Sequence, residues 1–184
     1  MIKNLCIIAT STQSISAFLK KYIEEFSKSN INITIVSNFK KNQKDYVDVS
    51  FLKNFDNVKT FHISFSRKPN IFLDIISLVR LIILFRKNSF DMFFSITPKA
   101  GFISSIAGLF SKIKHRIHIF TGQVWYTKNG LVRYILKKFD QIIGILNSEC
   151  LVDSFSQKEF LINEKVFKSS DANLTVVGEG SICG

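Results

Sequence analysis

Five short polar segments hold the side chains best suited to bind a substrate. Each follows a stretch that the sequence marks as a β-strand, and each offers hydroxyls, amides or glycines. Such groups suit a hydroxyl-rich, phosphorylated ligand, because they form hydrogen bonds and let it approach the backbone. Any one segment alone is better explained as an ordinary turn or cap, so the prediction depends on their shared character. The segments are Thr10 to Ser14, Thr97 to Gly101, Thr121 to Trp125, Asp153 to Ser154 and Gly178 to Ser181.

Two of these segments bear on phosphate binding. Thr10 to Ser14 lacks the GxGxxG of dinucleotide-binding folds and the GxxxxGK[ST] of P-loop proteins, which disfavours a redox cofactor and an ATPase. The helix expected at Pro98 points free backbone amides toward the ligand edge, and Lys99 lies in its first turn, where a cation opposes the helix dipole. A bound phosphate would relieve that conflict, although Lys99 equally suits a solvated helix start.

The histidines and carboxylates form no recognisable catalytic set. His62 and His118 lie within expected strands, where histidine usually packs, and His115 lies in a basic loop. The three cysteines have neither the pairing of a disulfide framework nor the spacing of a zinc site. We therefore nominate no catalytic residue and expect no metal or other cofactor. Asp153 is the one carboxylate at a strand end before a helix, where it also suits a capping or orienting role.

Short apolar stretches alternate with amphipathic ones along the chain. The apolar run Leu5 to Ala9 is typical of a buried parallel strand, and the apolar spacing from Ile15 to Phe26 predicts a helix after it. The unit recurs, which predicts an α/β fold with a doubly wound parallel sheet. Further strands are expected at Ile31 to Val36, Val58 to Ile63, Phe90 to Ile96, Arg116 to Phe120, Cys150 to Val152 and Leu174 to Val177, and further helices at Asn70 to Phe85, Pro98 to Phe110, Leu131 to Leu146 and Ser156 to Ile162.

Capping residues mark several helix starts. Thr97 before Pro98 is a good N-cap, Asn129 is a candidate for the next helix, and Ser156 with Glu159 forms a capping-box pattern. Ligands of open parallel sheets bind beyond the carboxyl ends of the strands. We therefore expect the residues that follow the later strands to lie near one edge: Thr97, Thr121, Asp153 and Gly178.

Composition limits the protein class. The 184 residues suffice for one buried domain, and the net charge of +11 is dispersed, so it attracts anions without choosing among nucleic acid, anionic lipid and phosphorylated substrate. The N-terminus lacks a signal-peptide pattern. The longest apolar stretch, Ile71 to Phe85, contains Asp74 and Arg80 and is shorter than the roughly 20 residues of a membrane span. We expect a cytoplasmic location.

An ordered set of short motifs resembles the N-terminal domain of glycosyltransferase family 4, especially members that build capsules, O-antigens and exopolysaccharides. The pieces are weak singly, but their order is specific, and the resemblance runs from the first strand to Gly184. The motifs are Ile96-Thr-Pro-Lys-Ala-Gly101, Ile117-His-Ile-Phe-Thr-Gly-Gln-Val-Trp125, Leu151-Val-Asp-Ser-Phe-Ser-Gln157, Phe160-Leu-Ile162 and Val177-Gly-Glu-Gly-Ser-Ile-Cys-Gly184.

The resemblance implies that residues 1–184 form the first Rossmann-like domain of a GT-B enzyme, which supplies the acceptor side of an interdomain cleft. It implies a lipid-linked sugar acceptor, a nucleotide-sugar donor, retention of configuration and no essential metal. The nucleotide sugar would bind only with a donor domain or subunit. The cleft-lining candidates are Ser11, Thr12, Gln13, Thr97, Lys99, Gly101, Thr121, Gly122, Gln123, Trp125, Asp153 and Ser154, with Gly178, Gly180 and Ser181 at the donor-phosphate edge.

The sequence departs from the family pattern in three respects. Its first loop, Thr10 to Ser14, is rich in Ser and Thr where many members have glycines near the donor phosphates. Many members place a catalytic His immediately before the glycine that matches Gly122, where this chain has Thr121, and His118 does not match. The C-terminal donor-binding domain is absent from the 184 residues. We expect a truncated glycosyltransferase that is inactive alone, or alternatively an acceptor or membrane-docking subunit of a split enzyme. A basic nucleic-acid-binding domain has only charge in its favour, so we expect no nucleic-acid partner.

Two helices suggest peripheral contact with the anionic inner face of the cell membrane. The helix from Leu131 to Leu146 carries Arg133, Lys137 and Lys138 away from much of its apolar stripe, and the Ile71 to Phe85 helix is followed by two basic residues. Each basic residue near an anionic bilayer contributes on the order of 1 kcal/mol. Alternatively, both stripes pack entirely against the sheet and the lysines only face solvent.

Overall fold

Seven parallel strands form one sheet in the computed structural model, which describes residues 2–66, 70–178 and 180. The strand order is β3-β2-β1-β4-β5-β6-β7, and all neighbouring strands pair in parallel. The chain thus winds outward from β1 in both directions, which confirms the doubly wound prediction. The strands are β1 (Asn4–Ser11), β2 (Asn32–Asn38), β3 (Val58–His62), β4 (Met92–Ile96), β5 (His115–Phe120), β6 (Glu149–Val152) and β7 (Leu174–Val176).

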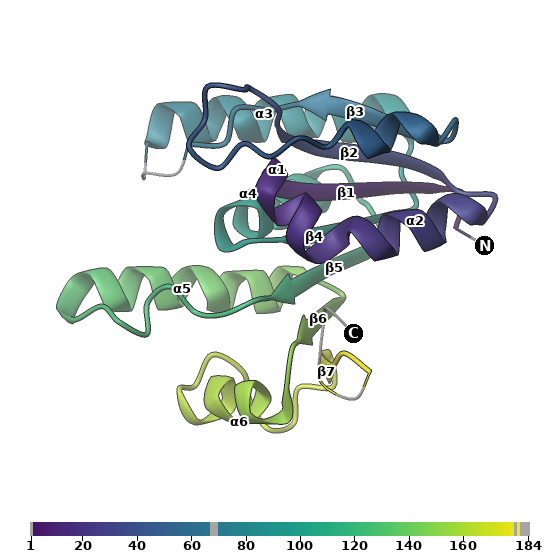
Figure 1. Ribbon diagram of the computed structural model, residues 1–184. Coiled ribbons are helices and arrows are strands. Elements are labelled where there is room, and N and C mark those ends of the chain that lie inside the picture. Colours follow the sequence, from purple (N-terminus) through teal and green to yellow (C-terminus); the bar gives the residue numbers. More distant parts are fainter. Residues whose placement is uncertain (1, 67–69, 179, 181–184) are drawn as a thin grey trace.

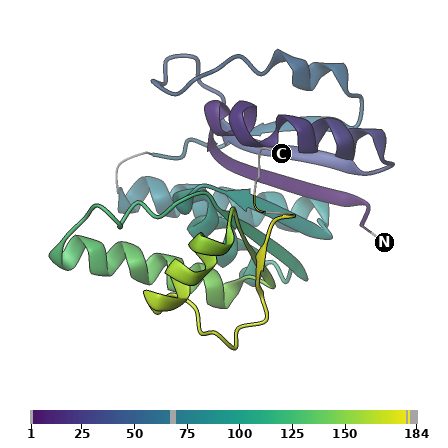
Figure 2. The same ribbon diagram turned by 60° about the horizontal axis from the view of Figure 1, so that its bottom comes forward.

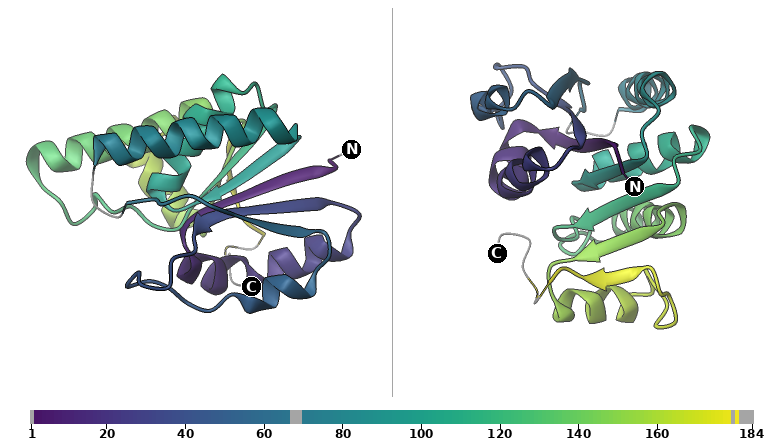
Figure 3. Two further views of the ribbon diagram at one scale, coloured as in Figure 1. Left: turned by 90° about the horizontal axis from the view of Figure 1, so that it is seen from above. Right: turned by 90° about the vertical axis from the view of Figure 1, so that its right-hand side faces the viewer.

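Helices cover both faces of this sheet, as Figures 1 and 3 show. A continuous helical stretch after β1 covers one face, and α3, α4 and α5 lie side by side on the other. The last helix, α6, lies beside β6 and β7 (Figure 2). The helices are α1 (Thr12–Ser14), the π-helical η1 (Ile15–Leu19), α2 (Lys20–Lys28), the 3-10 helix η2 (Ser50–Asn54), α3 (Ile71–Asn88), α4 (Pro98–Phe110), α5 (Gly130–Leu146) and α6 (Phe155–Asn163).

The two faces of β1 divide the core. Leu5, Ile7 and Ala9 point into a cluster with the helical stretch after β1, whereas Cys6 and Ile8 point into a cluster with α3 and α4. All five side chains are at most 1% exposed. The run of apolar residues without alternation is therefore explained by burial on both faces of a central parallel strand.

The predicted caps are only partly correct. Thr97 and Asn129 occupy the N-cap positions of α4 and α5, but neither side chain makes a capping hydrogen bond. The capping box at Ser156 is wrong, because α6 begins earlier than predicted and Ser154 is its cap. The Ser154 hydroxyl accepts a hydrogen bond of 3.1 Å from the backbone N–H of Gln157.

The sheet places the predicted ligand segments together. β4, β5, β6 and β7 run in one direction, so the residues that follow them lie at a common carboxyl edge, as predicted: Thr97, Thr121, Asp153 and Gly178. Within the described ranges, none of the helices combines the length and the apolar character that crossing a bilayer requires.

Candidate functional site

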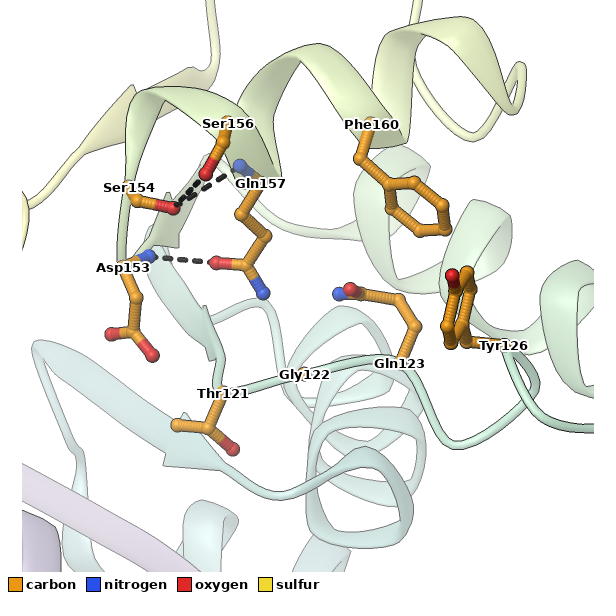
Figure 4. A pocket seen from close by; sticks show the side chains of 9 residues that line it. All are labelled: Thr121, Gly122, Gln123, Tyr126, Asp153, Ser154, Ser156, Gln157 and Phe160. Carbon is orange, nitrogen blue, oxygen red and sulfur yellow. Dashed lines mark hydrogen bonds between the residues drawn. The ribbon is translucent and has the colours of Figure 1, made fainter.

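An open pocket of about 450 Å³ lies at the carboxyl ends of β5 and β6. One wall is the loop that leaves β5, and the other is the junction from β6 into α6 (Figure 4). The five lining residues predicted from the sequence are Thr121, Gly122, Gln123, Asp153 and Ser154. The four that sequence reasoning missed are Tyr126, Ser156, Gln157 and Phe160.

The start of α6 orients the polar wall of the pocket. The backbone N–H of Asp153 donates a hydrogen bond of 2.7 Å to Oε1 of Gln157. This contact fixes the Gln157 amide, whose nitrogen lies on the side that faces Gln123 in Figure 4. The Asp153 carboxylate points toward the loop that carries Thr121. The junction thus offers a carboxylate, hydroxyls and an oriented amide.

Gln123 supplies a second amide from the opposite wall. Its Nε2 is buried and has no hydrogen-bond partner among the described residues. A buried donor without an acceptor costs about 1–3 kcal/mol. Gln123 and Gln157 thus place two amide groups on opposite walls of the pocket (Figure 4), and amides are groups that hydrogen-bond to hydroxyl and carbonyl oxygens.

Aromatic rings form the far end of the pocket. The rings of Tyr126 and Phe160 meet edge to face, with centroids 5.5 Å apart and an interplanar angle of 78°. Behind them Phe160 stacks on Trp125 at 5.4 Å and 18°. Tyr126 is 63% exposed, so one aromatic side chain of the pair is accessible to a ligand.

Trp125 anchors the β5–α5 loop from beneath. It is fully buried, and its Nε1 donates a hydrogen bond of 2.6 Å to Oδ2 of the buried Asp140 on α5. Burial raises the pKa of Asp140 to about 6, against the opposing effect of this hydrogen bond. The expectation that Trp125 lines the cleft is therefore wrong, because the indole packs in the core and supports the residues that do line it.

Two basic residues of α5 also lie against the indole of Trp125. Arg133 and Lys137 lie 5.3 Å and 5.5 Å from the Trp125 ring centroid. Each also forms an ion pair of 2.7 Å with Glu164. These hydrogen bonds and charges, from Lys137 first, hold the pKa of Glu164 below its usual range. Two of the three α5 cations predicted to face a membrane are thus engaged inside the protein.

The predicted residues at the β1 end do not line the pocket at β5 and β6. Thr12 is fully buried, and its Oγ1 accepts a hydrogen bond of 2.8 Å from the backbone N–H of Val47. Ser11 is also buried, and its hydroxyl caps α1. Gln13 is exposed, away from the β5–β6 pocket. For Thr12 the cleft-lining prediction is wrong, because the backbone uses its hydroxyl.

The β4–α4 segment also differs from its prediction. Lys99 forms an ion pair of 2.9 Å with Asp74 of α3, and this carboxylate offsets the conflict with the helix dipole that a phosphate was expected to relieve. Gly101 packs against the sheet, because a Cβ there would lie 2.3 Å from Cε1 of His118. The cleft-lining role of Gly101 is therefore wrong. Thr97 follows β4 with a backbone φ of +78°.

The three residues predicted at the donor-phosphate edge lie in different places. Gly178 borders a separate hollow of about 480 Å³ beside β7 and α6. Gly180 approaches the pocket junction, since a Cβ there would lie 3.4 Å from the backbone oxygen of Asp153. Ser181 lies outside the described residues.

His118 is a packing residue, as predicted. It is 1% exposed, and its Nδ1 lies 2.9 Å from the hydroxyl of Ser95. Burial lowers the pKa of His118 to about 3, so the ring is neutral at physiological pH. The ring packs against Gly101 of α4 and does not line the pocket. This agrees with the sequence comparison above, in which His118 does not match the position of the catalytic histidine of the resembled family.

Comparison with known sequences gives one consistent family. Residues 5–145 match the family model described as glycosyl transferase 4-like. CapM of Staphylococcus aureus, a capsular polysaccharide biosynthesis glycosyltransferase, is 29% identical over 177 residues. That alignment covers 96% of this chain and 43% of CapM, so the chain spans less than half of this relative.

Solved structures share the fold. The UDP-GlcNAc 2-epimerase of Neisseria meningitidis bound to UDP-GlcNAc superposes with a TM-score of 0.69 at 16% identity, over 97% of this chain and 46% of that one. The lipopolysaccharide outer core galactosyltransferase WaaB superposes with a TM-score of 0.63 at 17% identity, over 93% of this chain and 44% of that one. At these identities the likeness shows the fold and not the reaction.

Proposed function

Because the chain belongs to the glycosyl transferase 4-like family, we propose that it forms the acceptor-side half of a glycosyltransferase that builds a surface polysaccharide. The capsular role is that of CapM, which this chain resembles along 96% of its length. Retention of configuration rests on the family resemblance alone. The contacts to the donor nucleotide sugar come, in this proposal, from a domain or subunit outside the 184 residues.

The observation that carries the proposal is the pocket at the carboxyl ends of β5 and β6. It brings hydroxyl, amide, carboxylate and aromatic groups from two loops to one place. Sugar sites need such a mixture, because a pyranose presents hydroxyls around its rim and C–H groups on its faces. The pocket is open, as one wall of a cleft between two domains would be.

We further propose that the acceptor is a lipid-linked sugar at the cytoplasmic face of an anionic membrane. The first turns of α3 and α5 extend past the strands on the same side of the molecule (Figure 1). They carry exposed apolar side chains: Ile71 at 76%, Phe72 at 81%, Leu131 at 72% and Val132 at 55%. Apolar stripes of this kind insert into the headgroup region of a bilayer. These residues therefore do not pack on the sheet, contrary to the alternative in which the stripes are wholly buried.

Binding of the acceptor is the first test. The purified chain is mixed with nanodiscs of one anionic lipid composition, with or without a polyprenyl diphosphate-linked monosaccharide. We expect tighter binding to the sugar-bearing nanodiscs, because the pocket adds contacts that the lipid alone lacks. Equal binding to both would contradict an acceptor-side role.

Donor binding is the second test. Calorimetry of the isolated chain against a panel of UDP- and GDP-sugars should show no micromolar binding, because only one wall of the cleft is present. Micromolar affinity of the pure chain for any of them would overturn the assignment as an acceptor half.

A further inference from the structure

The two walls of the pocket at β5 and β6 belong to separate segments of the chain. The last residues at which these two strands pair are Phe120 and Val152. Beyond this pair, the loop with Gln123 and Tyr126 forms one wall, and α6 with Phe160 forms part of the other (Figure 4). The spacing of the walls at the aromatic end therefore depends on contacts outside the sheet.

Helix α5 binds the end of α6 through one stripe of its surface. Arg133 and Lys137 each form an ion pair of 2.7 Å with Glu164, one with each carboxylate oxygen. One turn further along α5, Gln141 donates a hydrogen bond of 2.6 Å to the backbone oxygen of Lys165. Residues four apart lie on the same face of a helix, and Glu164 directly follows α6. These contacts hold the C-terminal end of α6 against α5.

The same two cations also reach the loop that forms the opposite wall. Arg133 lies 5.3 Å and Lys137 5.5 Å from the ring centroid of Trp125, which is within the range of cation–π attraction. The Nη1 atom of Arg133 donates a hydrogen bond of 3.5 Å to the backbone oxygen of Tyr126. Glu164 thus binds two side chains that contact the loop, and the end of α6 is connected to the loop through them.

We propose that Glu164 is a positioning residue: through the two cations it holds Tyr126 and Phe160 at a fixed distance, so that the pocket is preformed for the acceptor sugar. Glu164 is not among the residues that line the pocket. Its backbone N–H donates a hydrogen bond of 2.9 Å to the backbone oxygen of Phe160, so a shift of Glu164 is passed to this ring. Hydrogen bonds from Lys137 and Arg133 hold the pKa of Glu164 below its usual range, so the carboxylate is ionised at neutral pH. The inference rests on the proposed function.

Hydrogen exchange of the full chain is the first test, with Glu159→Gln as the matched control for Glu164→Gln. Both changes remove one carboxylate, but Glu159 is exposed on α6 and does not line the pocket. The backbone amides of Tyr126 and Lys128 donate hydrogen bonds of 3.0 Å within the loop and report its opening. We expect them to exchange roughly fivefold faster in Glu164→Gln only, because two partly exposed ion pairs are lost. Gln141 still binds the end of α6, so amides of the sheet should exchange as in the natural chain.

Sugar recognition is the second test. Each chain is mixed with anionic nanodiscs with or without the polyprenyl diphosphate-linked monosaccharide. Glu164→Gln should reduce the preference for sugar-bearing nanodiscs roughly fivefold, whereas Glu159→Gln should keep it. Both variants lose one negative charge, so their binding to the plain nanodiscs should be equal. Adding Lys137→Gln to Glu164→Gln should cost less than the sum of the two single losses, because Glu164 acts through this cation.

The outcomes separate this inference from the proposed function. Unchanged loop exchange or an unchanged sugar preference in Glu164→Gln would overturn the positioning role, and so would strictly additive losses in the double variant. The preference of the natural chain for sugar-bearing nanodiscs would still support the proposed function in each of these cases. Absence of that preference in the natural chain would instead overturn the proposed function, and this inference with it.

Discussion

The indole N–H of Trp125 donates a hydrogen bond of 2.6 Å to a carboxylate oxygen of Asp140, and both residues are buried. Trp125 belongs to the loop that supplies Gln123 and Tyr126 to the pocket, whereas Asp140 lies in the middle of α5. The bond therefore ties a functional loop to a helix of the core. The bond requires a carboxylate in the protein interior, and burial raises the pKa of Asp140 to about 6.

Asp140→Asn should change the pH dependence of stability. A carboxyl whose folded pKa exceeds its unfolded value is protonated more readily in the native state, so its destabilising effect is present at neutral pH and is relieved as the pH falls through about 6. The amide keeps an oxygen for Trp125 but does not titrate. Relative to the Asp140→Asn variant, we expect the natural chain to gain roughly 1 kcal/mol between about pH 7 and about pH 5 in urea denaturation. A constant difference between the two chains would contradict a raised pKa.

Gly101→Ala should destabilise the fold. A Cβ at this position would lie 2.3 Å from Cε1 of His118, and that ring is held by Ser95 in the core. Such overpacking costs about 1–3 kcal/mol. The double change Gly101→Ala with His118→Ala tests the cause, because its cost in urea denaturation should be less than the sum of the two single costs. Additive costs would show that the two residues do not compete for space.

Thr97 tests backbone strain at the β4–α4 junction. Its φ of +78° is unfavourable for a β-branched residue, and its Oγ1 accepts a hydrogen bond of 3.3 Å from the backbone N–H of Thr10. Thr97→Ala and Thr97→Gly both lose this acceptor, but only glycine relieves the strain. The Gly variant should therefore be more stable than the Ala variant by about 1 kcal/mol in thermal unfolding. The reverse order would contradict the positive φ.

The sequence predicted the elements whose signals are local. An apolar run such as Leu5 to Ala9 has few alternatives to a central parallel strand, and the topology then places Thr121 and Asp153 at one edge. The alternation of strand-like with helix-like segments, and the spacing of apolar residues within each helix, are local signals that require no knowledge of long-range contacts. The fold class and five of the nine pocket residues followed from these signals.

The errors arise where a long-range contact determines the role of a side chain. Lys99 and Asp74 lie on different helices, so their ion pair has no local sequence signal. The burial of Trp125 depends on Asp140, which lies on the following helix. Phe160 was assigned to a helix correctly, but the loop that its ring faces could not be inferred from its spacing.

Membrane docking through the first turns of α3 and α5 is tested by substitution. Phe72→Glu and Leu131→Glu replace apolar side chains that are 81% and 72% exposed, so folding should be little affected. Each loses the insertion of a large apolar group, worth about 1.5–3 kcal/mol, and adds repulsion from anionic lipid. We expect roughly tenfold weaker flotation with anionic liposomes for each variant.

Phe110→Glu is the control for these two variants. It introduces the same charge at an apolar side chain that is 59% exposed, but this side chain lies at the C-terminal end of α4 and not at a helix start. The natural chain should float with anionic liposomes more than with neutral ones, and less at high salt. Equal losses in all three variants, or equal recovery on both lipid types, would show that these helix starts and the positive charge do not dock the protein to a membrane.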